Sequence, residues 1–432
     1  MRRILIVLGV ISVMLLVSWG MFACAQTEIT IWCHGFDPHR RGFERVASMF
    51  MEKNPDIKVT VEPQADIATK IKSALAAGEA SDIFTPRGED IMEMVYTKSI
   101  LPFPEDIFTV EELKEKCWPE YYLQAPFDKV YAFGIPDPLG DAGIVINLDM
   151  LVEAGLEKVD RFTSMEQMLE YAEKLTKRDS RGNVEIAGFS AREYNNQVYF
   201  WDFIAEQGGK FYDNDTGLFN YQTEEARKAL QFFYDIYYTY RFDSVDLPAS
   251  FDALAQELAA MAFMWGEYIP FSKMTYPELN FGFAIKPPFF GATEPIVTHV
   301  DTWNVAVWSG TKHKDVAFKF VAYMTTPEAQ LAFLEENPGI SPLKELAKPE
   351  YFQDELRSWL LPLLDLLPKA KFWGPFGNDS IIKDSLQRLM SSVIYQEMTV
   401  EEALEEMTKQ CNEAITNFRK KYPEAPKAKI EW

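Results

Sequence analysis

The sequence predicts an α/β protein with two lobes, and three observations carry that prediction. Apolar strand patterns and helical stripes alternate from residue 29 onward, which is typical of a mostly parallel sheet with helices on both faces. A chain of 432 residues is too long for one compact core. No internal repeat or low-complexity linker separates its halves, so we expect two intimately joined lobes rather than separate domains on a string.

The first elements follow one another as strand, helix, strand, helix, strand. Ile29, Ile31 and Cys33 alternate in a first strand, and an apolar helical stripe over 43–51 ends at Asn54-Pro55. A second strand is expected over 57–61, a helix over 67–75 that ends near Gly78, and a third strand over 82–84. Sheets of this kind bind ligands in the loops at the carboxyl ends of their strands.

The second half repeats the theme. A strand over 143–148 leads into a helix over 149–154, and Thr163-Ser164-Met165-Glu166 is a capping box that opens a further helix. Buried strands are expected over 260–264 and 281–285. From residue 347 the pattern is nearly all helical.

Residues 281–333 join three structural signals in an unusual order. Lys286-Pro287-Pro288 stops the strand over 281–285, and a short apolar run follows at Val305–Trp308. Apolar residues at helical spacing then occupy 316–324. Thr326 can cap a new helix that begins Pro327-Glu328-Ala329-Gln330, with proline where its missing N–H costs nothing.

The N-terminus has the pattern of an export signal. Arg2-Arg3 precedes an apolar run over 4–17, and Ala23-Cys24-Ala25 is an A-x-A cleavage site before Gln26. We expect residues 1–25 to be a signal peptide and the protein to be periplasmic or extracellular. Two alternatives stay open: an uncleaved anchor, and lipid attachment at Cys24, although Phe22 departs from the usual lipobox.

Composition narrows the classes of partner and of chemistry. The formal net charge of −22 would repel phosphate backbones, so we expect no nucleic-acid partner. Beyond the leader the cysteines are Cys33, Cys117 and Cys411, an odd and scattered set that is no disulfide framework. One bridge is possible, but we expect buried thiols.

Several segments together resemble the family 1 extracellular solute-binding proteins of ABC importers. The resemblance rests on the order and spacing of these pieces, beside the Thr-Pro-Glu-Ala-Gln segment: FMEKNPDIKV (50–59), AAGEASDIF (76–84), ILPFP (100–104), YAFGIPDPLGDAGIVINLDMLVEAGL (131–156), 163–188 and MTVEEALEE (398–406). It covers nearly the whole chain after the leader. One departure is Asp301-Thr302-Trp303-Asn304, where many relatives carry Gly-Gly, and this leaves the class of ligand open.

The resemblance implies two lobes that close on a ligand, joined by crossings near 137–142, 296–300 and 339–342. The N-terminal lobe would hold residues 26–138 and 298–341, and the C-terminal lobe residues 142–295 and 342–432. It implies a monomeric receptor, not an enzyme and without a cofactor, that hands a carbohydrate, expected to be an oligosaccharide, to ABC permease subunits. A peptide, a polyamine or another small metabolite is the alternative ligand, and an exported carbohydrate-active enzyme is the rival function.

A sugar cleft needs flat aromatic faces for the C–H faces of the rings and planar polar groups for the hydroxyls. An arginine there could also read a carboxylate with two hydrogen bonds, which leaves an acidic sugar open. For each aromatic residue the alternative is ordinary core packing. The candidates lie at strand ends, at the crossings and in one Gly/Pro-rich loop: Trp32, His34, Arg87, Asp141, Trp265, Asp301, Trp303 and Trp373.

Signals for other chemistry are weak. His34, Asp37 and His39 lie close together in the sequence, but a metal needs a preorganised third or fourth ligand, so we expect no metal site. Residues 213–217 imitate a calcium loop but have glycine one position too early, and a turn before a strand is the better interpretation. No G-x-S-x-G, H-E-x-x-H, P-loop or dinucleotide fingerprint occurs, so no catalytic residue is assigned.

Overall fold

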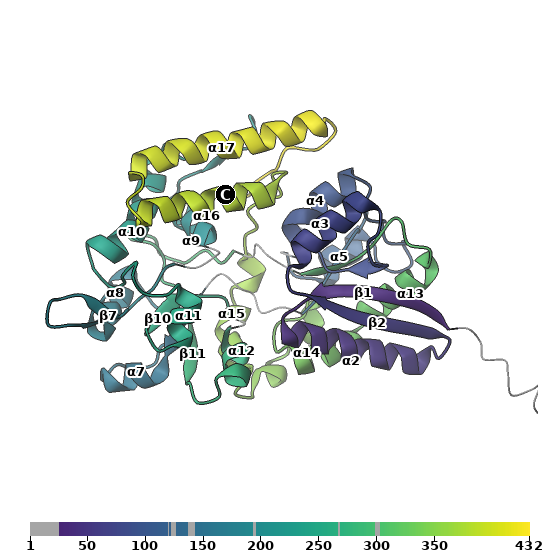
Figure 1. Cartoon of the computed structure of the whole chain (residues 1–432), viewed down its shortest axis with the longest axis horizontal. Helices are drawn as coiled ribbons and strands as arrows, with labels where there is room; N and C mark the ends of the chain where they lie inside the picture. The colour runs from purple at the N-terminus through teal and green to yellow at the C-terminus, as the bar shows by residue number, and fades with distance from the viewer. Residues whose placement is uncertain are drawn as a thin grey trace, which may run out of the picture.

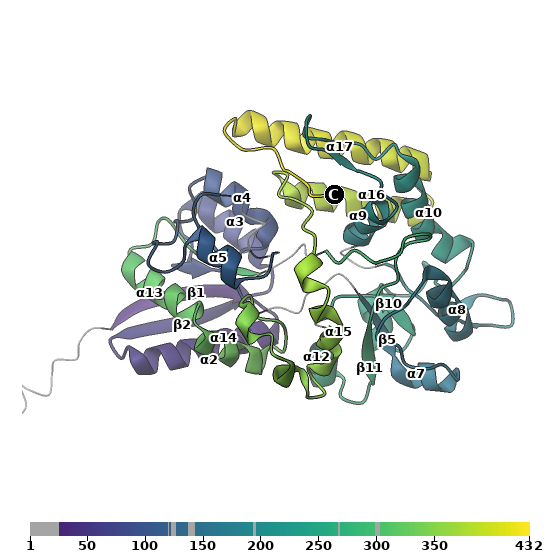
Figure 2. The same cartoon turned by 180° about the vertical axis from the view of Figure 1, so that it is seen from behind.

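Two lobes lie side by side in the computed structural model of the chain (Figure 1). The structure describes residues 26–119, 121, 127–136, 143–192, 196–266, 268–298 and 303–432. The purple and blue elements of the N-terminal part share one lobe with two green helices from later in the chain, and the teal and yellow elements form the other (Figures 1 and 2). The predicted crossing at 137–142 lies outside the described residues, as do residues 299 and 300 of the second crossing.

The sheet of the first lobe has five strands in the order β2-β1-β3-β12-β4. β1 (Thr27–His34) lies parallel to β2 (Ile57–Gln64) and to β3 (Ile83–Phe84), as the alternating pattern predicted. β12 (Asn304–Val307) pairs antiparallel with β3 and with β4 (Phe133–Gly134). The chain therefore returns to this sheet after building part of the other lobe.

Helices cover this sheet, and four of those described lie where the sequence predicts a helix, over 43–51, over 67–75, over 316–324 and from 327 onward. The helices of this lobe are α2 (Asp37–Lys53), α3 (Ile67–Ala77), α4 (Gly88–Tyr96), α5 (Val110–Lys116), α13 (Lys314–Met324) and α14 (Pro327–Glu336). Gly78 ends α3 with a φ of 72°, a left-handed conformation that glycine adopts without strain. The Thr326 hydroxyl accepts a hydrogen bond from the N–H of Ala329, and Pro327 occupies the first turn of α14. The predicted cap is thus confirmed.

The sheet of the second lobe differs from the expectation. Its order is β10-β5-β11, and the central β5 (Gly143–Asn147) is antiparallel to both β10 (Met261–Phe263) and β11 (Phe281–Ile285). All of these residues are buried, so the sequence shows a continuous apolar run for each strand. Such a run predicts burial but does not encode direction, and a parallel sheet was therefore the wrong expectation here.

Helices and two small hairpins complete this lobe. The hairpins are β6 (Lys177–Arg178) with β7 (Val184–Ile186), and β8 (Tyr212–Asp213) with β9 (Leu218–Phe219). Residues 213–217 form the turn of the second hairpin, as expected. The helices are α7 (Leu148–Glu153), α8 (Met165–Leu175), α9 (Asn196–Glu206), α10 (Glu224–Tyr238), α11 (Ser250–Ala255) and α12 (Tyr268–Thr275).

The tail is mostly helical, with short 3-10 segments before two long helices. The long helices are α16 (Asp379–Ile394) and α17 (Val400–Lys421), and they pack against each other above the second lobe (Figure 1). The short segments are η1 (Lys344–Leu346), η2 (Pro349–Phe352), η3 (Ser358–Leu360), α15 (Leu361–Leu364) and η4 (Leu367–Lys369). Within the described part of the chain, no helix is both long and apolar enough to cross a membrane.

Separate apolar cores hold the two lobes. One core collects residues from 29–135 and 303–343, and two others collect residues from 144–297 and from 340–430. Cys33, Cys117 and Cys411 are buried in these cores, as expected, and no disulfide joins the described cysteines. The exact lobe boundaries given above stay a prediction.

A buried charge cluster anchors the chain where it approaches the second crossing. The Lys286 ammonium is hydrogen-bonded to Glu206 and lies 3.7 Å from a carboxylate oxygen of Asp202, and all three side chains are fully buried. Glu206 also accepts the N–H of Ile296 at 2.7 Å, and Asp202 accepts the Thr298 hydroxyl. Burial raises the pKa of Asp202 to about 7.

Candidate functional site

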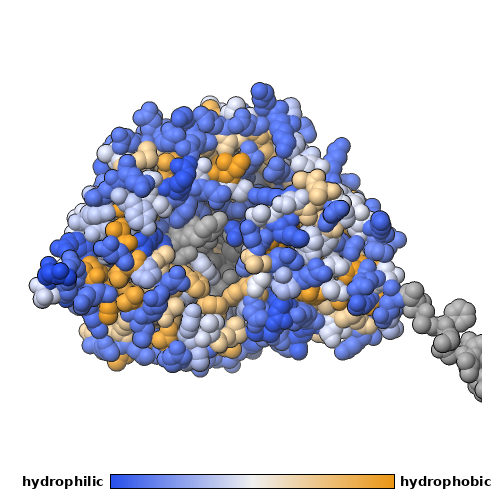
Figure 3. All heavy atoms as spheres, in the orientation of Figure 1, coloured by the Kyte–Doolittle hydropathy of each residue, from blue (hydrophilic) through white to orange (hydrophobic). Residues whose placement is uncertain are grey.

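The surface between the two lobes is hollowed on the face seen in Figure 3. Side chains of the first lobe that come from three strand ends lie on one side of the lobe junction. Aromatic side chains of the second lobe lie on the other. A ring pair crosses the junction here: Phe36, just after β1, and Phe271 in α12 have ring centroids 5.7 Å apart.

Trp303 is the centre of the first group. Its ring stacks on that of His34, with centroids 4.7 Å apart and planes inclined by 22°, and the Arg87 guanidinium lies 5.1 Å from the Trp303 ring centroid. Trp303 precedes β12, His34 ends β1 and Arg87 follows β3. Because these three strands are neighbours in the sheet, the fold brings together three residues that the sequence keeps far apart. All three were predicted site residues.

The backbone fixes this arrangement. Arg87 and Trp303 form an antiparallel bridge, and the Trp303 carbonyl accepts the N–H of Ile135 at 3.0 Å. The N–H of Asn304 donates to the carbonyl of Pro86 at 3.0 Å. Trp303 itself is 7% exposed, so most of its indole surface is packed and only a part can meet a ligand. Such a site is largely preformed.

His34 is held in its neutral form. Its pKa is lowered to about 3, mainly by burial and to a smaller extent by the nearby charges of His39 and Arg87. Its Nδ1 accepts the N–H of Phe36 at 3.3 Å, so the ring proton of the neutral imidazole is assigned to Nε2. His34 can therefore offer an N–H donor to a ligand without carrying a charge.

The second group is an aromatic cluster around Trp265. Its ring stacks on Phe251, with centroids 5.9 Å apart and an interplanar angle of 25°. Phe251 in turn lies 5.3 Å from Phe271, the ring that meets Phe36 of the other lobe. Trp265 is half-buried, so part of its surface is open. An aromatic chain thus runs from Trp265 across the junction to the first lobe.

Three members of this chain were missed from the sequence: Phe36, Phe251 and Phe271. Phe271 could have been found, because Trp265, Tyr268 and Phe271 recur at a spacing of three, which places them along one side of a helical segment. Phe36 lies two residues after the end of the first strand, where ligand contacts are expected. No local signal distinguishes Phe251 from a core residue.

Two predicted site residues lie elsewhere. The Trp32 indole N–H donates to Glu62 of β2 at 2.9 Å, and the Lys70 ammonium lies 4.7 Å from the Trp32 ring centroid. The Trp32 side chain is therefore held by contacts within its own lobe. Trp373 is 2% exposed, and its indole N–H donates to Asp202 at 2.8 Å inside the second lobe. We leave Trp373 out of the proposed site for that reason. Asp141 and Asp301 lie outside the described residues.

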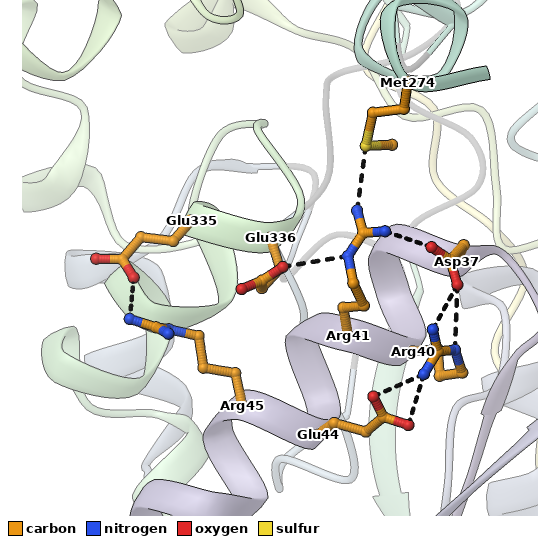
Figure 4. A network of polar contacts seen from close by, with 8 residues as sticks. All are labelled: Asp37, Arg40, Arg41, Glu44, Arg45, Met274, Glu335 and Glu336. Atoms are coloured by element: carbon orange, nitrogen blue, oxygen red, sulfur yellow. Dashed lines mark hydrogen bonds and ion pairs between the residues drawn. The ribbon is translucent and has the colours of Figure 1, made fainter.

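A second contact across the junction lies near the beginning of α2 (Figure 4). Arg41 is 3.1 Å from the sulfur of Met274 in α12, 3.2 Å from Glu336 at the end of α14, and hydrogen-bonded to Asp37. Arg40 makes ion pairs with Asp37 and Glu44 within α2, and Arg45 pairs with Glu335 of α14. These side chains are largely exposed, so each pair contributes little to stability. Among the described residues, no group of three His, Cys, Asp or Glu side chains is placed to hold a metal ion.

The fold and this junction define a class of protein with two α/β lobes and an aromatic junction between them. The chain belongs to the bacterial extracellular solute-binding protein family, whose family model matches residues 45–357. This is a family of binding proteins, and the fold that the resemblance implied is confirmed.

Known relatives are distant in sequence and close in fold. The maltotriose-binding protein of Pyrococcus abyssi is 22% identical over 397 residues, which cover 87% of this chain and 82% of that protein. The GacH receptor of Streptomyces glaucescens, solved unliganded and with acarbose, has 17% identity and a TM-score of 0.74, with 91% of this chain and 99% of that one covered. An ABC substrate-binding protein of Listeria monocytogenes in complex with cycloalternan has 18% identity and a TM-score of 0.74, with 90% and 99% covered.

Proposed function

We propose that the protein is the exported receptor of an ABC importer and that it binds an oligosaccharide between its lobes. The observation that carries the proposal is the aromatic chain from Trp265 through Phe271 and Phe36 toward the His34–Trp303 stack. Sugar rings present flat C–H faces that pack on such side chains. The ligands of these relatives, maltotriose, acarbose and cycloalternan, are carbohydrates and support the same class of ligand.

Polar groups for the hydroxyls stand beside the aromatic rings. His34 offers an uncharged N–H donor, and Arg87 offers guanidinium donors at the start of α4. We propose that Asp141 and Asp301 contribute as acceptors from the crossings. Together with Trp265 and Trp303, these residues form the proposed site. The proposal also includes the lobe boundaries predicted from the sequence and a monomeric protein.

Closure and export complete the proposed cycle. The ligand would favour the closed form through contacts that both lobes make with it. The closed receptor would dock on ABC permease subunits and release the sugar unchanged. Membership of an extracellular family and the leader pattern of residues 1–25 support a place outside the cytoplasm.

Binding is tested first by thermal shift with single mono- and oligosaccharides, then by calorimetry with those that raise the melting temperature. A ligand that binds only the folded state raises that temperature. Trp265→Ala should weaken binding about tenfold or more, the loss of about 1.4 kcal/mol or more of ring contact. Tyr395→Ala, an exposed aromatic at the end of α16, is the matched control and should bind as the wild type does.

The rival enzymatic function has a separate test. Labelled oligosaccharides that bind should be recovered intact after prolonged incubation with the protein. Cleavage products that appear with the wild type and grow with time would replace the receptor proposal by a hydrolase. A thermal shift with peptides or polyamines, and with no carbohydrate, would keep the receptor and change its ligand.

A further inference from the structure

We propose that Lys383 of α16 is a positioning residue for the binding site of the opposite lobe, and that it acts through Glu89 of α4. Closure of the lobes and assembly of the site are then one event. The inference rests on the proposed function. Its central observation is an ion pair between the Lys383 ammonium and the Glu89 carboxylate, which joins helices from the two lobes (Figures 1 and 2).

The ion pair is almost completely buried. The side chain of Lys383 is 9% exposed and that of Glu89 is 7% exposed. Charged groups are rarely buried unless they are paired, and a partner left alone in such a place carries the full cost of its lost hydration. When the lobes separate, both groups return to water. The pair therefore contributes to the closed form and not to the folding of either lobe by itself.

Other contacts join the two lobes at the same junction. Lys72 of α3 lies 3.0 Å from a carboxylate oxygen of Asp90 and donates to the Ser380 hydroxyl of α16 at 3.3 Å. Beside them, Met92 of α4 packs with Phe418 and Tyr422 from the end of α17. Met92 lies three residues after Glu89 on α4, so this apolar contact joins the lobes close to the ion pair.

Glu89 also connects the junction to the binding site. One of its carboxylate oxygens lies 3.9 Å from the Arg87 guanidinium, and that guanidinium lies over the Trp303 ring. Trp303 in turn stacks on His34. The sequence of contacts is continuous from Lys383 to the centre of the site, and the Arg87 side chain is 23% exposed.

Glu89 thus stands between two cations from different lobes. In the closed form Lys383 neutralises most of the charge of Glu89. Arg87 then stays over the Trp303 ring, where the N–H groups of its guanidinium are available to a ligand. In the open form Lys383 withdraws, Glu89 attracts Arg87 more strongly, and the guanidinium leaves the ring. Binding at Arg87 and closure at Lys383 favour each other, as linkage requires.

Three variants test this mechanism: Lys383→Gln, Lys383→Met and the charge reversal Glu89→Lys/Lys383→Glu. Lys383→Met keeps the packing of the aliphatic stem, so it separates charge from shape. Lys421→Gln is the matched control, because Lys421 and Glu93 form an exposed pair at the same junction. The readouts are affinity for a sugar found by thermal shift, and the radius of gyration in solution with and without that sugar.

We expect both Lys383 variants to bind about tenfold more weakly and to be more open without sugar, with the control unchanged. The charge reversal restores the interlobe pair but places a lysine beside Arg87. It should recover the radius of gyration and not the affinity. Recovery of both would show that the ion pair only holds the lobes together and does not position Arg87. Wild-type affinity in both Lys383 variants would overturn the inference altogether. If no sugar binds the wild type, the proposed function fails, while the radius of gyration still tests the pair.

Discussion

Trp303 stacks on His34 with 4.7 Å between the ring centroids, although the two residues come from opposite ends of the N-terminal lobe's sequence. The sheet order explains the contact, because β12 returns next to β3, which lies beside β1. The Trp303 ring, which contacts both His34 and the Arg87 guanidinium, is preorganised for a ligand. The His34–Trp303 stack is therefore the central contact of the candidate site.

Trp303→Ala should remove the largest aromatic surface of the N-terminal half of the site. We expect a loss of about 2 kcal/mol in binding free energy, which is a Kd roughly thirtyfold higher in calorimetry. Trp303→Phe keeps a ring for His34 and should recover much of the affinity. Equal affinities of Trp303→Ala and the wild type, with both folded by near-ultraviolet circular dichroism, would remove Trp303 from the site.

His34 should not titrate near neutrality. Its pKa of about 3 in the folded protein lies below the ordinary value of 6.5, so the imidazole stays neutral from pH 5 to pH 8. Sugar affinity should therefore be insensitive to His34 over that range. The stability that His34 contributes is complete above pH 6.5 and is lost as the pH falls from 6.5 toward 3.

Nuclear magnetic resonance can follow this ring directly. The imidazole signal that disappears in His34→Gln should keep a constant chemical shift between pH 5 and pH 8. An inflection near pH 6.5 for that signal would show a solvated histidine, and the stacked arrangement with Trp303 would then be absent in solution.

Asp202 should make stability depend on pH in the opposite direction. Burial raises its pKa to about 7 from an ordinary value of 3.8. Below pH 4 the carboxyl is protonated in both folded and unfolded chains, so burial costs nothing. Between pH 4 and pH 7 only the unfolded chain loses the proton, and the free energy of unfolding falls by an amount on the order of 2–4 kcal/mol.

Asp202→Asn isolates this contribution, because an amide does not ionise and its oxygen can still accept from Thr298 and Trp373. Urea unfolding at several pH values should show a smaller fall in stability between pH 4 and pH 7 for the variant than for the wild type. Parallel curves for the two proteins would mean that Asp202 is ionised throughout, with Lys286 as its full counter-ion.

The structure also bears on the charge of the ligand. Arg87 already has Glu89 and the Trp303 ring as partners, so a neutral oligosaccharide fits the site better than a uronate. We expect larger thermal shifts with neutral sugars, and a roughly three- to tenfold weaker affinity in Arg87→Gln from the loss of hydrogen bonds. A preference for uronates that disappears in Arg87→Gln would instead make Arg87 a carboxylate reader.

Sequence patterns predicted what depends on local physics. The Thr326 cap, the turn over 213–217 and the strands of the first sheet all follow from residues close in the chain. The same is true of the Arg87, His34 and Trp303 group, because strand ends meet at one edge of a sheet. The family resemblance supplied the rest of the fold.

What failed depends on contacts between distant elements. The three strands of the second lobe are buried on both sides, so their pattern did not reveal that they run antiparallel. Trp373 lies in a loop rich in glycine and proline, yet its indole N–H is buried against Asp202. The Lys383–Glu89 pair and the Phe36–Phe271 contact form only where the two lobes pack against each other, so no periodicity within the sequence predicts them.

The most direct test of the central claim is calorimetric titration of the wild-type protein with neutral oligosaccharides, including maltotriose and mannobiose. A receptor with its site between the lobes should bind at least one of them with one site per chain and return it chemically unchanged. Its radius of gyration should fall on binding, because the lobes close on the ligand. Saturable binding with no change in the radius of gyration, or no binding of any neutral oligosaccharide, would contradict the account.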